Sequence, residues 1–126
     1  MSMTQGEVIT FERTFTRAEV EQFTTLSMDT GNHHVHPDER GRLMLQGLLT
    51  ATMPTKIGGD QNVIARTMRF HFKKPVYADE QIRCDVTIDK LTVKENGRTA
   101  LLASFVCTNE QEESVLEGNF DGVIIK

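Results

Sequence analysis

The sequence has little of several residue types that mark specialised proteins. Among its 126 residues there is no tryptophan, one tyrosine, three prolines and two cysteines. Neither Cys84 nor Cys107 belongs to a Cys-x-x-Cys pair, so a zinc knuckle or a dithiol redox motif is unsupported. Both cysteines lie in strand-like apolar patterns, and we expect them to be reduced, buried thiols.

Positive charge is also scarce. Fourteen Lys and Arg residues stand against eighteen Asp and Glu residues, for a net charge of −4. This balance disfavours a broad basic face, so no nucleic-acid partner is expected. No Arg- or Lys-led apolar segment opens the chain, and no apolar run approaches the length of a membrane span. We therefore expect no membrane partner and, by default, a cytoplasmic location.

The chain has the length and composition of one globular domain, covering residues 1–126. Apolar residues make up 38% and charged residues 25%, which is ordinary for a soluble domain. There is no internal repeat and no linker-like stretch. The core is modest, and residues 99–108 are apolar on both faces of a predicted strand. A homo-oligomer, at least a dimer, is therefore expected.

The N-terminal third predicts a strand, a helix and a loop. Residues 7–15 alternate as a strand does. Thr16 and Glu19 have the spacing of a capping box, in which each side chain bonds the other residue's backbone amide. The helix that they start is predicted to end near Ser27. Residues 29–42 are polar and contain Gly31, Pro37 and Gly41, which predicts an irregular loop.

A second helix is predicted in the middle of the chain. Apolar residues recur at helical spacing over residues 45–57. Gly58 and Gly59 predict its C-terminal stop. Pro54 removes one backbone hydrogen bond and predicts a bend. Few charges precede Lys56, so other structure is expected to surround this helix.

The remaining sequence predicts strands. In the first of them Ile64 is expected on the same side as Met68, Phe70 and Phe72. Asn96-Gly97 predicts a type I′ hairpin turn, in which both residues have positive φ. One buried helix and a mainly antiparallel sheet give an α+β fold. A ferredoxin-like fold would need a second long helix among the later strands. The predicted strands occupy residues 64–72, 82–89, 99–108 and 115–125.

Three of the four histidines lie in the loop over residues 29–42. His33, His34 and His36 are candidate functional residues for this reason. A metal site made from them is disfavoured, because adjacent histidines in a loop rarely converge on one ion. His71 alternates with the apolar face of its strand and is expected at the surface.

The segment that precedes these histidines resembles the MaoC-type (R)-specific enoyl-CoA hydratase/dehydratase family. The run Phe15-Thr16-Arg17-Ala18-Glu19-Val20 through Phe23 and Leu26-Ser27-Met28-Asp29 carries the resemblance. In that family an Asp after this helix is followed five residues later by a His, as Asp29 is by His34. Gln46-Gly47 is similar to the His-Gly that opens the family's long helix, and Lys74-Pro75-Val76-Tyr77 is similar to an Arg-Pro-Val strand end. The resemblance implies a hotdog fold, a long central helix wrapped by a curved antiparallel sheet.

The sequence departs from the family pattern at three places. Asn32 follows Asp29 by three residues rather than two and has no proline after it. Gln46 replaces the usual His, and the loop before the long helix is short. A second alignment matches Val35-His36-Pro37-Asp38 to the family and makes His36 the catalytic histidine. The five-residue spacing favours His34. An extended loop would put His34 and His36 on one side and turn His33 away.

The resemblance implies addition of water to an enoyl thioester, or its removal. Water must be held and deprotonated, the α-carbon must receive a proton, and charge on the thioester oxygen must be stabilised. Asp29, His34 and the backbone amide of Gly47 are the candidates for these roles. Candidate substrate-binding residues are Asn32, Gln46 and Lys74. No cofactor is expected, since coenzyme A or an acyl carrier protein serves only as the carrier of the substrate.

Two other functions stay open at this point. A thioesterase of the same fold usually activates water with a carboxylate in or beside the central helix. Residues 45–59 contain no Asp or Glu, although Asp60 follows them. A non-catalytic protein that binds acyl ligands is the other alternative, because a fold does not determine a function.

Overall fold

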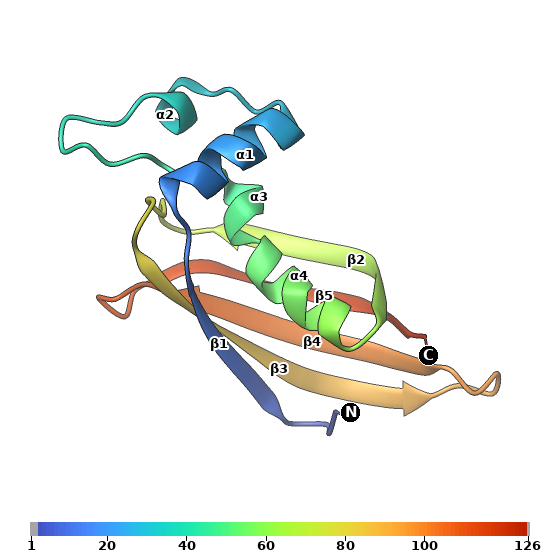
Figure 1. Cartoon of the computed structure of the whole chain (residues 1–126). Helices are drawn as coiled ribbons and strands as arrows, with labels where there is room; N and C mark the ends of the chain where they lie inside the picture. Colours follow the sequence, from blue (N-terminus) through green and yellow to red (C-terminus); the bar gives the residue numbers. More distant parts are fainter. Residues whose placement is uncertain (1–2, 126) are drawn as a thin grey trace.

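The computed structural model describes residues 3–125 and shows a five-stranded sheet curled around a helix (Figure 1). Every neighbouring pair of strands is antiparallel. The predicted α+β fold, with a curved antiparallel sheet, is confirmed. Across the sheet the strands are β1 (Val8–Thr14), β3 (Gln81–Val93), β4 (Thr99–Thr108), β5 (Ser114–Ile124) and β2 (Val63–Phe72).

Alternating side chains on the middle strands form the core. On β3 the side chains of Ile82, Cys84, Val86 and Ile88 are buried, and the residues between them are exposed or half-buried, as the two-residue period of a strand requires. Cys84 is paired directly with Cys107 across β3 and β4. Both cysteines are free and buried, as predicted. Contact with the Cys107 thiol and burial raise the pKa of the Cys84 thiol.

Helix α1 (Arg17–Ser27) begins as predicted and ends at a left-handed residue. Thr16 and Glu19 form the complete capping box. Met28 has φ 63° and closes the helix. The prediction of an irregular loop is wrong for Asn32–Val35. These residues form α2, a single helical turn. The His36 amide donates to the Asn32 carbonyl within it. One turn is too short to give a periodic pattern in sequence.

The central helix consists of two segments, α3 (Gly47–Thr50) and α4 (Thr52–Asp60). They cross one face of the sheet (Figure 1). Where Pro54 predicted a bend, the helix is interrupted at Ala51, three residues before the proline. Proline has no amide hydrogen to donate to the carbonyl four residues earlier, so the helix is interrupted there.

The predicted helix stop at Gly58-Gly59 is wrong. Helix α4 runs through both glycines to Asp60. Asn62 has φ 59° and turns the chain away in the left-handed conformation, a role that asparagine also accepts. The sequence signal for the end of this helix was therefore the asparagine.

Two strand predictions are also corrected. A register shift between Ala65 and Thr67 marks a bulge in β2. The bulge reverses the alternation, so Ile64 is 54% exposed instead of facing the core. In the turn between β3 and β4, Gly97 has φ 81° but Asn96 has no positive φ. The turn is therefore not type I′.

Within residues 3–125, no helix has the length and hydropathy needed to cross a membrane.

Candidate active site

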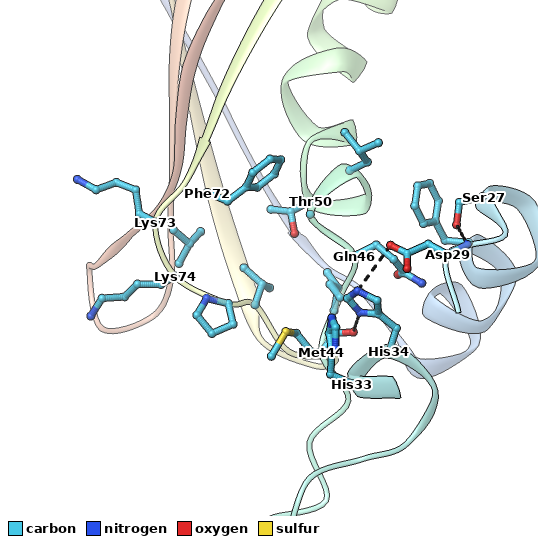
Figure 2. Close-up of a pocket in the computed structure, with 17 residues that line it drawn as sticks. Ser27, Asp29, His33, His34, Met44, Gln46, Thr50, Phe72, Lys73 and Lys74 are labelled. Atoms are coloured by element: carbon cyan, nitrogen blue, oxygen red, sulfur yellow. Dashed lines mark hydrogen bonds and ion pairs between the residues drawn. The ribbon is translucent and has the colours of Figure 1, made fainter. Parts of the chain in front are cut away.

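A cavity of about 570 Å³ lies where the start of the central helix meets the loop after α1 and the end of β2. Much of its wall is apolar. Polar side chains gather on one side, where Asp29, His34 and Gln46 lie together (Figure 2). The apolar lining comes from Phe23, Met44, Leu45, Leu48, Phe72, Pro75, Val76 and Val115.

Asp29 and His34 approach each other on this wall. Asp29 directly follows the left-handed Met28 that ends α1. Its Oδ1 accepts a hydrogen bond from the Gly31 amide at 3.2 Å. Its Oδ2 lies 3.7 Å from His34 Nε2, with the Asp29 side chain 51% exposed and the His34 side chain 7% exposed. This separation is too long for a direct hydrogen bond. A water beside the pair can contact both groups.

A backbone carbonyl orients the His34 ring. His34 Nδ1 lies 2.7 Å from the Met44 carbonyl oxygen. Because a carbonyl only accepts, Nδ1 carries the hydrogen and donates it. Backbone hydrogen bonds on either side fix the position of the Met44 carbonyl. The Leu45 amide donates to the Val76 carbonyl at 2.8 Å, and the Ala78 amide donates to the Leu43 carbonyl at 2.8 Å. His34 Nε2 is therefore the nitrogen that faces Asp29.

Gly47 is the first residue of α3 and also lines the cavity. Among the described residues none accepts a hydrogen bond from its amide, as is usual at a helix start. A Cβ placed on Gly47 would lie 2.8 Å from Cε1 of Phe72. Glycine thus lets the Phe72 ring lie against the backbone. Because α3 is a single helical turn, the group that can bind a ligand at its start is the free amide of Gly47, not the helix as a whole.

The other loop residues are placed differently from one another. His36 and Asn32 are exposed and do not line the cavity. His33 does line it, and its ring centroid lies 4.0 Å from that of His34. The prediction that His33 points away from the site is wrong. It assumed an extended loop, whereas residues 32–35 form a helical turn. Within residues 3–125 no group of three or more potential ligands is placed to hold a metal ion.

Gln46 and Lys74 both line the cavity. Gln46 is 1% exposed, and its Nε2 donates to Thr24 Oγ1 at 2.7 Å. Lys74 lies at the cavity mouth and is paired with Glu113. The hydrogen bond from Lys74 lowers the pKa of the Glu113 carboxyl. Lys73 lies beside it as a second cation and is paired with Glu117.

Sequence comparison places the chain in a family. Residues 42–118 match the family model described as FAS1-like, dehydratase domain region. The chain belongs to this dehydratase family. The match covers the central helix, β2, β3, β4 and the start of β5, and it includes Gln46 and Gly47. Comparison with curated proteins gave no match.

Solved structures share the fold of this dehydratase-family chain. The (R)-hydratase from A. caviae involved in PHA biosynthesis superposes with a TM-score of 0.84 at 20% identity, over 99% of this chain and 98% of that one. The MaoC-like dehydratase from Rhodospirillum rubrum gives 0.74 at 15% identity, over 98% and 94%. The C-terminally truncated HadBC (3R-hydroxyacyl-ACP dehydratase) complex from Mycobacterium tuberculosis gives 0.69 at 17% identity, over 97% and 98%. The fold is the hotdog fold.

Proposed function

We propose that this protein adds water to an α,β-unsaturated acyl thioester, or removes it, as an (R)-specific hydratase/dehydratase. One observation carries the proposal. The Asp29 carboxylate lies 3.7 Å from Nε2 of an imidazole whose other nitrogen is committed to a backbone carbonyl. The pair lies on the polar side of a largely apolar cavity. Membership of a dehydratase family supports the same reaction.

Asp29 and His34 divide the proton transfers. Asp29 takes a proton from the bound water while the water oxygen bonds to the β-carbon. Protonated His34 gives the hydrogen on Nε2 to the α-carbon. The proton on Asp29 then returns to His34 Nε2, which restores both groups. Imidazole suits this role because it is the side chain that gains and loses a proton near neutral pH.

The remaining wall holds the thioester. The Gly47 amide donates to the thioester oxygen as negative charge develops on it. The apolar side chains, among them Leu48 and Phe72, contact the acyl chain. Lys73 and Lys74 lie at the mouth, where the carrier of the acyl group would leave the cavity. Either coenzyme A or an acyl carrier protein brings phosphate groups to such cations.

The thioesterase alternative requires a carboxylate in or beside the central helix. Asp60 is the one candidate that the sequence left open. It lies at the far end of α4 from Gly47, is paired with Lys56 and does not line the cavity. This placement favours hydration over thioester hydrolysis.

We also propose that the chain forms a homodimer through β2. This strand ends the sheet, so one row of its backbone groups has no partner strand among residues 3–125. An exposed apolar side chain, Ile64 at 54%, lies on it. The HadBC structure, which shares the fold, is a complex. In a homodimer, β2 of the second copy would form hydrogen bonds with this row of backbone groups.

An assay with crotonyl-CoA and butyryl-CoA separates the three functions. A hydratase consumes the enoyl absorbance of crotonyl-CoA and releases no free thiol from either compound. A thioesterase releases free thiol, and a binding protein changes neither signal. Free thiol without enoyl loss would overturn the proposal.

A further inference from the structure

The Gln46 side chain contains a buried oxygen that has no hydrogen-bond donor. Gln46 is 1% exposed and lines the cavity. Its Oε1 is closed to bulk solvent and accepts no hydrogen bond from any residue that the structure describes. Such groups are rare in folded proteins, because a buried acceptor without a donor costs free energy.

The orientation of the Gln46 amide is set by its neighbour on α1. Thr24 Oγ1 has one hydrogen and donates it to the Val20 carbonyl at 2.9 Å. The same oxygen can therefore only accept from Gln46, and it does so from Nε2 at 2.7 Å. Turning the amide over would bring two acceptors together. Oε1 is thus left as an acceptor, and a hydroxyl or water hydrogen is what it can bind.

The Gln46 side chain lies next to the reacting groups. Gln46 immediately precedes Gly47 in the chain, and Figure 2 shows its side chain beside those of Asp29 and His34. A water held there has two hydrogens. In the proposed reaction Asp29 removes one of them, and the other stays on the oxygen that becomes the 3-hydroxyl group of the product.

We propose that Gln46 Oε1 accepts a hydrogen bond from the hydrogen that this oxygen keeps. Gln46 then aligns the water for attack on the enoyl thioester and recognises the 3-hydroxyl group of the hydroxyacyl thioester in the reverse direction. The inference rests on the proposed function. It makes the cavity selective for a ligand that carries a hydroxyl group at this carbon.

Gln46→Met tests the inference, because it keeps the length of the side chain and removes the acceptor. We expect kcat for crotonyl-CoA to fall about ten- to hundredfold and the melting temperature to rise by a few degrees, since the unpaired oxygen is gone. Gln46→Glu keeps an oxygen acceptor and should recover part of the turnover. Gln61→Met is the matched control, because Gln61 is a second buried glutamine that lies outside the cavity. A purely structural Gln46 would instead lower the melting temperature and leave kcat unchanged.

A binding measurement decides the point independently of turnover. In an Asp29→Asn background, calorimetry compares (R)-3-hydroxybutyryl-CoA with butyryl-CoA. We expect tighter binding of the hydroxyacyl thioester and loss of that preference in the Asp29→Asn, Gln46→Met double variant. If the preference is absent, or survives Gln46→Met, the inference fails. A wild-type protein that does not hydrate crotonyl-CoA, yet shows this Gln46-dependent preference, would overturn the proposed reaction and leave the hydroxyl contact standing.

Discussion

The aromatic ring of Phe72 occupies the space where a side chain on Gly47 would begin, 2.8 Å from Cε1 of the ring. Because Phe72 is half-exposed, its ring can move aside when that space is filled. It would then move across the cavity wall rather than disrupt the core. The contact therefore links the identity of residue 47 to the shape of the acyl site.

Gly47→Ala should lower kcat/KM for crotonyl-CoA at least tenfold with little change in melting temperature. The added methyl displaces the Phe72 ring and hinders the approach of the thioester to the amide. Gly47→Ala combined with Phe72→Ala separates the two effects. Recovery in the double variant would attribute the loss to the displaced ring, and no recovery would attribute it to the amide. Full activity of Gly47→Ala would remove Gly47 from the site.

Asp29→Asn should reduce turnover by roughly two or more orders of magnitude without unfolding the protein, because the amide cannot take a proton from water. Asp60→Asn is the matched control. The two aspartates are similarly exposed, with side chains at 51% and 49%, but Asp60 does not line the cavity. Turnover of both variants is measured with crotonyl-CoA. Equal loss in both, or activity of Asp29→Asn within a few-fold of wild type, would exclude the assigned role.

His34→Ala should abolish hydration, whereas His36→Ala should remain near wild type. Only His34 combines contact with Asp29 and a fixed ring. His33→Ala should fall between them, because His33 lines the cavity and its ring lies against that of His34. The three variants are compared in the same assay, with circular dichroism to check folding. An inactive His36→Ala beside an active His34→Ala would support the alignment through Val35-His36-Pro37-Asp38 instead.

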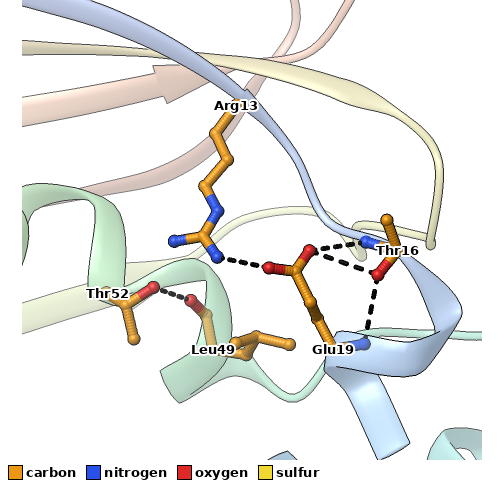
Figure 3. Close-up of polar contacts among 5 residues, drawn as sticks. All are labelled: Arg13, Thr16, Glu19, Leu49 and Thr52. Atoms are coloured by element: carbon orange, nitrogen blue, oxygen red, sulfur yellow. Dashed lines mark hydrogen bonds and ion pairs between the residues drawn. The ribbon is translucent and has the colours of Figure 1, made fainter.

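Glu19→Gln should weaken the fold most at neutral pH and least in acid. The backbone hydrogen bond from Thr16, followed by the bond from Arg13, lowers the pKa of Glu19 (Figure 3). A carboxylate with a lowered pKa stabilises the fold above its unfolded pKa, about 4.3, and loses that contribution as pH falls through its folded pKa. Because the pair is partly solvated, we expect roughly 0.2–1 kcal/mol.

The measurement for Glu19 is a set of thermal melts from pH 7 to pH 3. Glu19→Gln and wild type should converge at the acid end of the series. Thr16→Ala is the companion variant. It removes the other half of the capping box and should cost about 1 kcal/mol at neutral pH. A gap between Glu19→Gln and wild type that widens in acid would contradict the assignment.

Ile64→Lys should convert the protein from a dimer to a monomer in light scattering. A charge at this edge prevents a second β2 strand from pairing there. Val8→Lys is the control, since Val8 is also 54% exposed but lies on β1, at the opposite edge of the sheet. Dissociation by Val8→Lys alone would move the interface to β1. A wild-type monomer at micromolar concentration would refute the dimer.

The parts of the fold that follow from short-range patterns were predictable from sequence. The alternation in β3, the capping box of Thr16 and Glu19, and the interruption of the central helix near Pro54 each arise from a few neighbouring residues. At two other places the sequence pattern misled. The bulge in β2 reverses the side of Ile64, and helix α4 continues through two glycines because Asn62 is the residue that turns the chain.

The arrangement of the candidate site could not be predicted from sequence. The family resemblance suggested Asp29 and His34 as a pair, yet the turn that brings His34 against Asp29 has no periodic signal. His33 reaches the cavity for the same reason. Lys73 and Phe72 join the site because β2 ends beside the central helix, a relationship between segments far apart in the chain. No local rule relates those positions.

The hydrogen bond from His34 to the Met44 carbonyl has a consequence for how this protein tolerates change. Since every amino acid brings a carbonyl, the group that orients the imidazole survives almost any replacement of Met44. A substitution survey at position 44 would therefore register little, and an enzyme engineer could remodel that side chain to reshape the cavity. An insertion would have a larger effect. One added residue between Leu43 and Leu45 would move the Met44 carbonyl away from the His34 ring, so this short stretch is constrained in length rather than in composition.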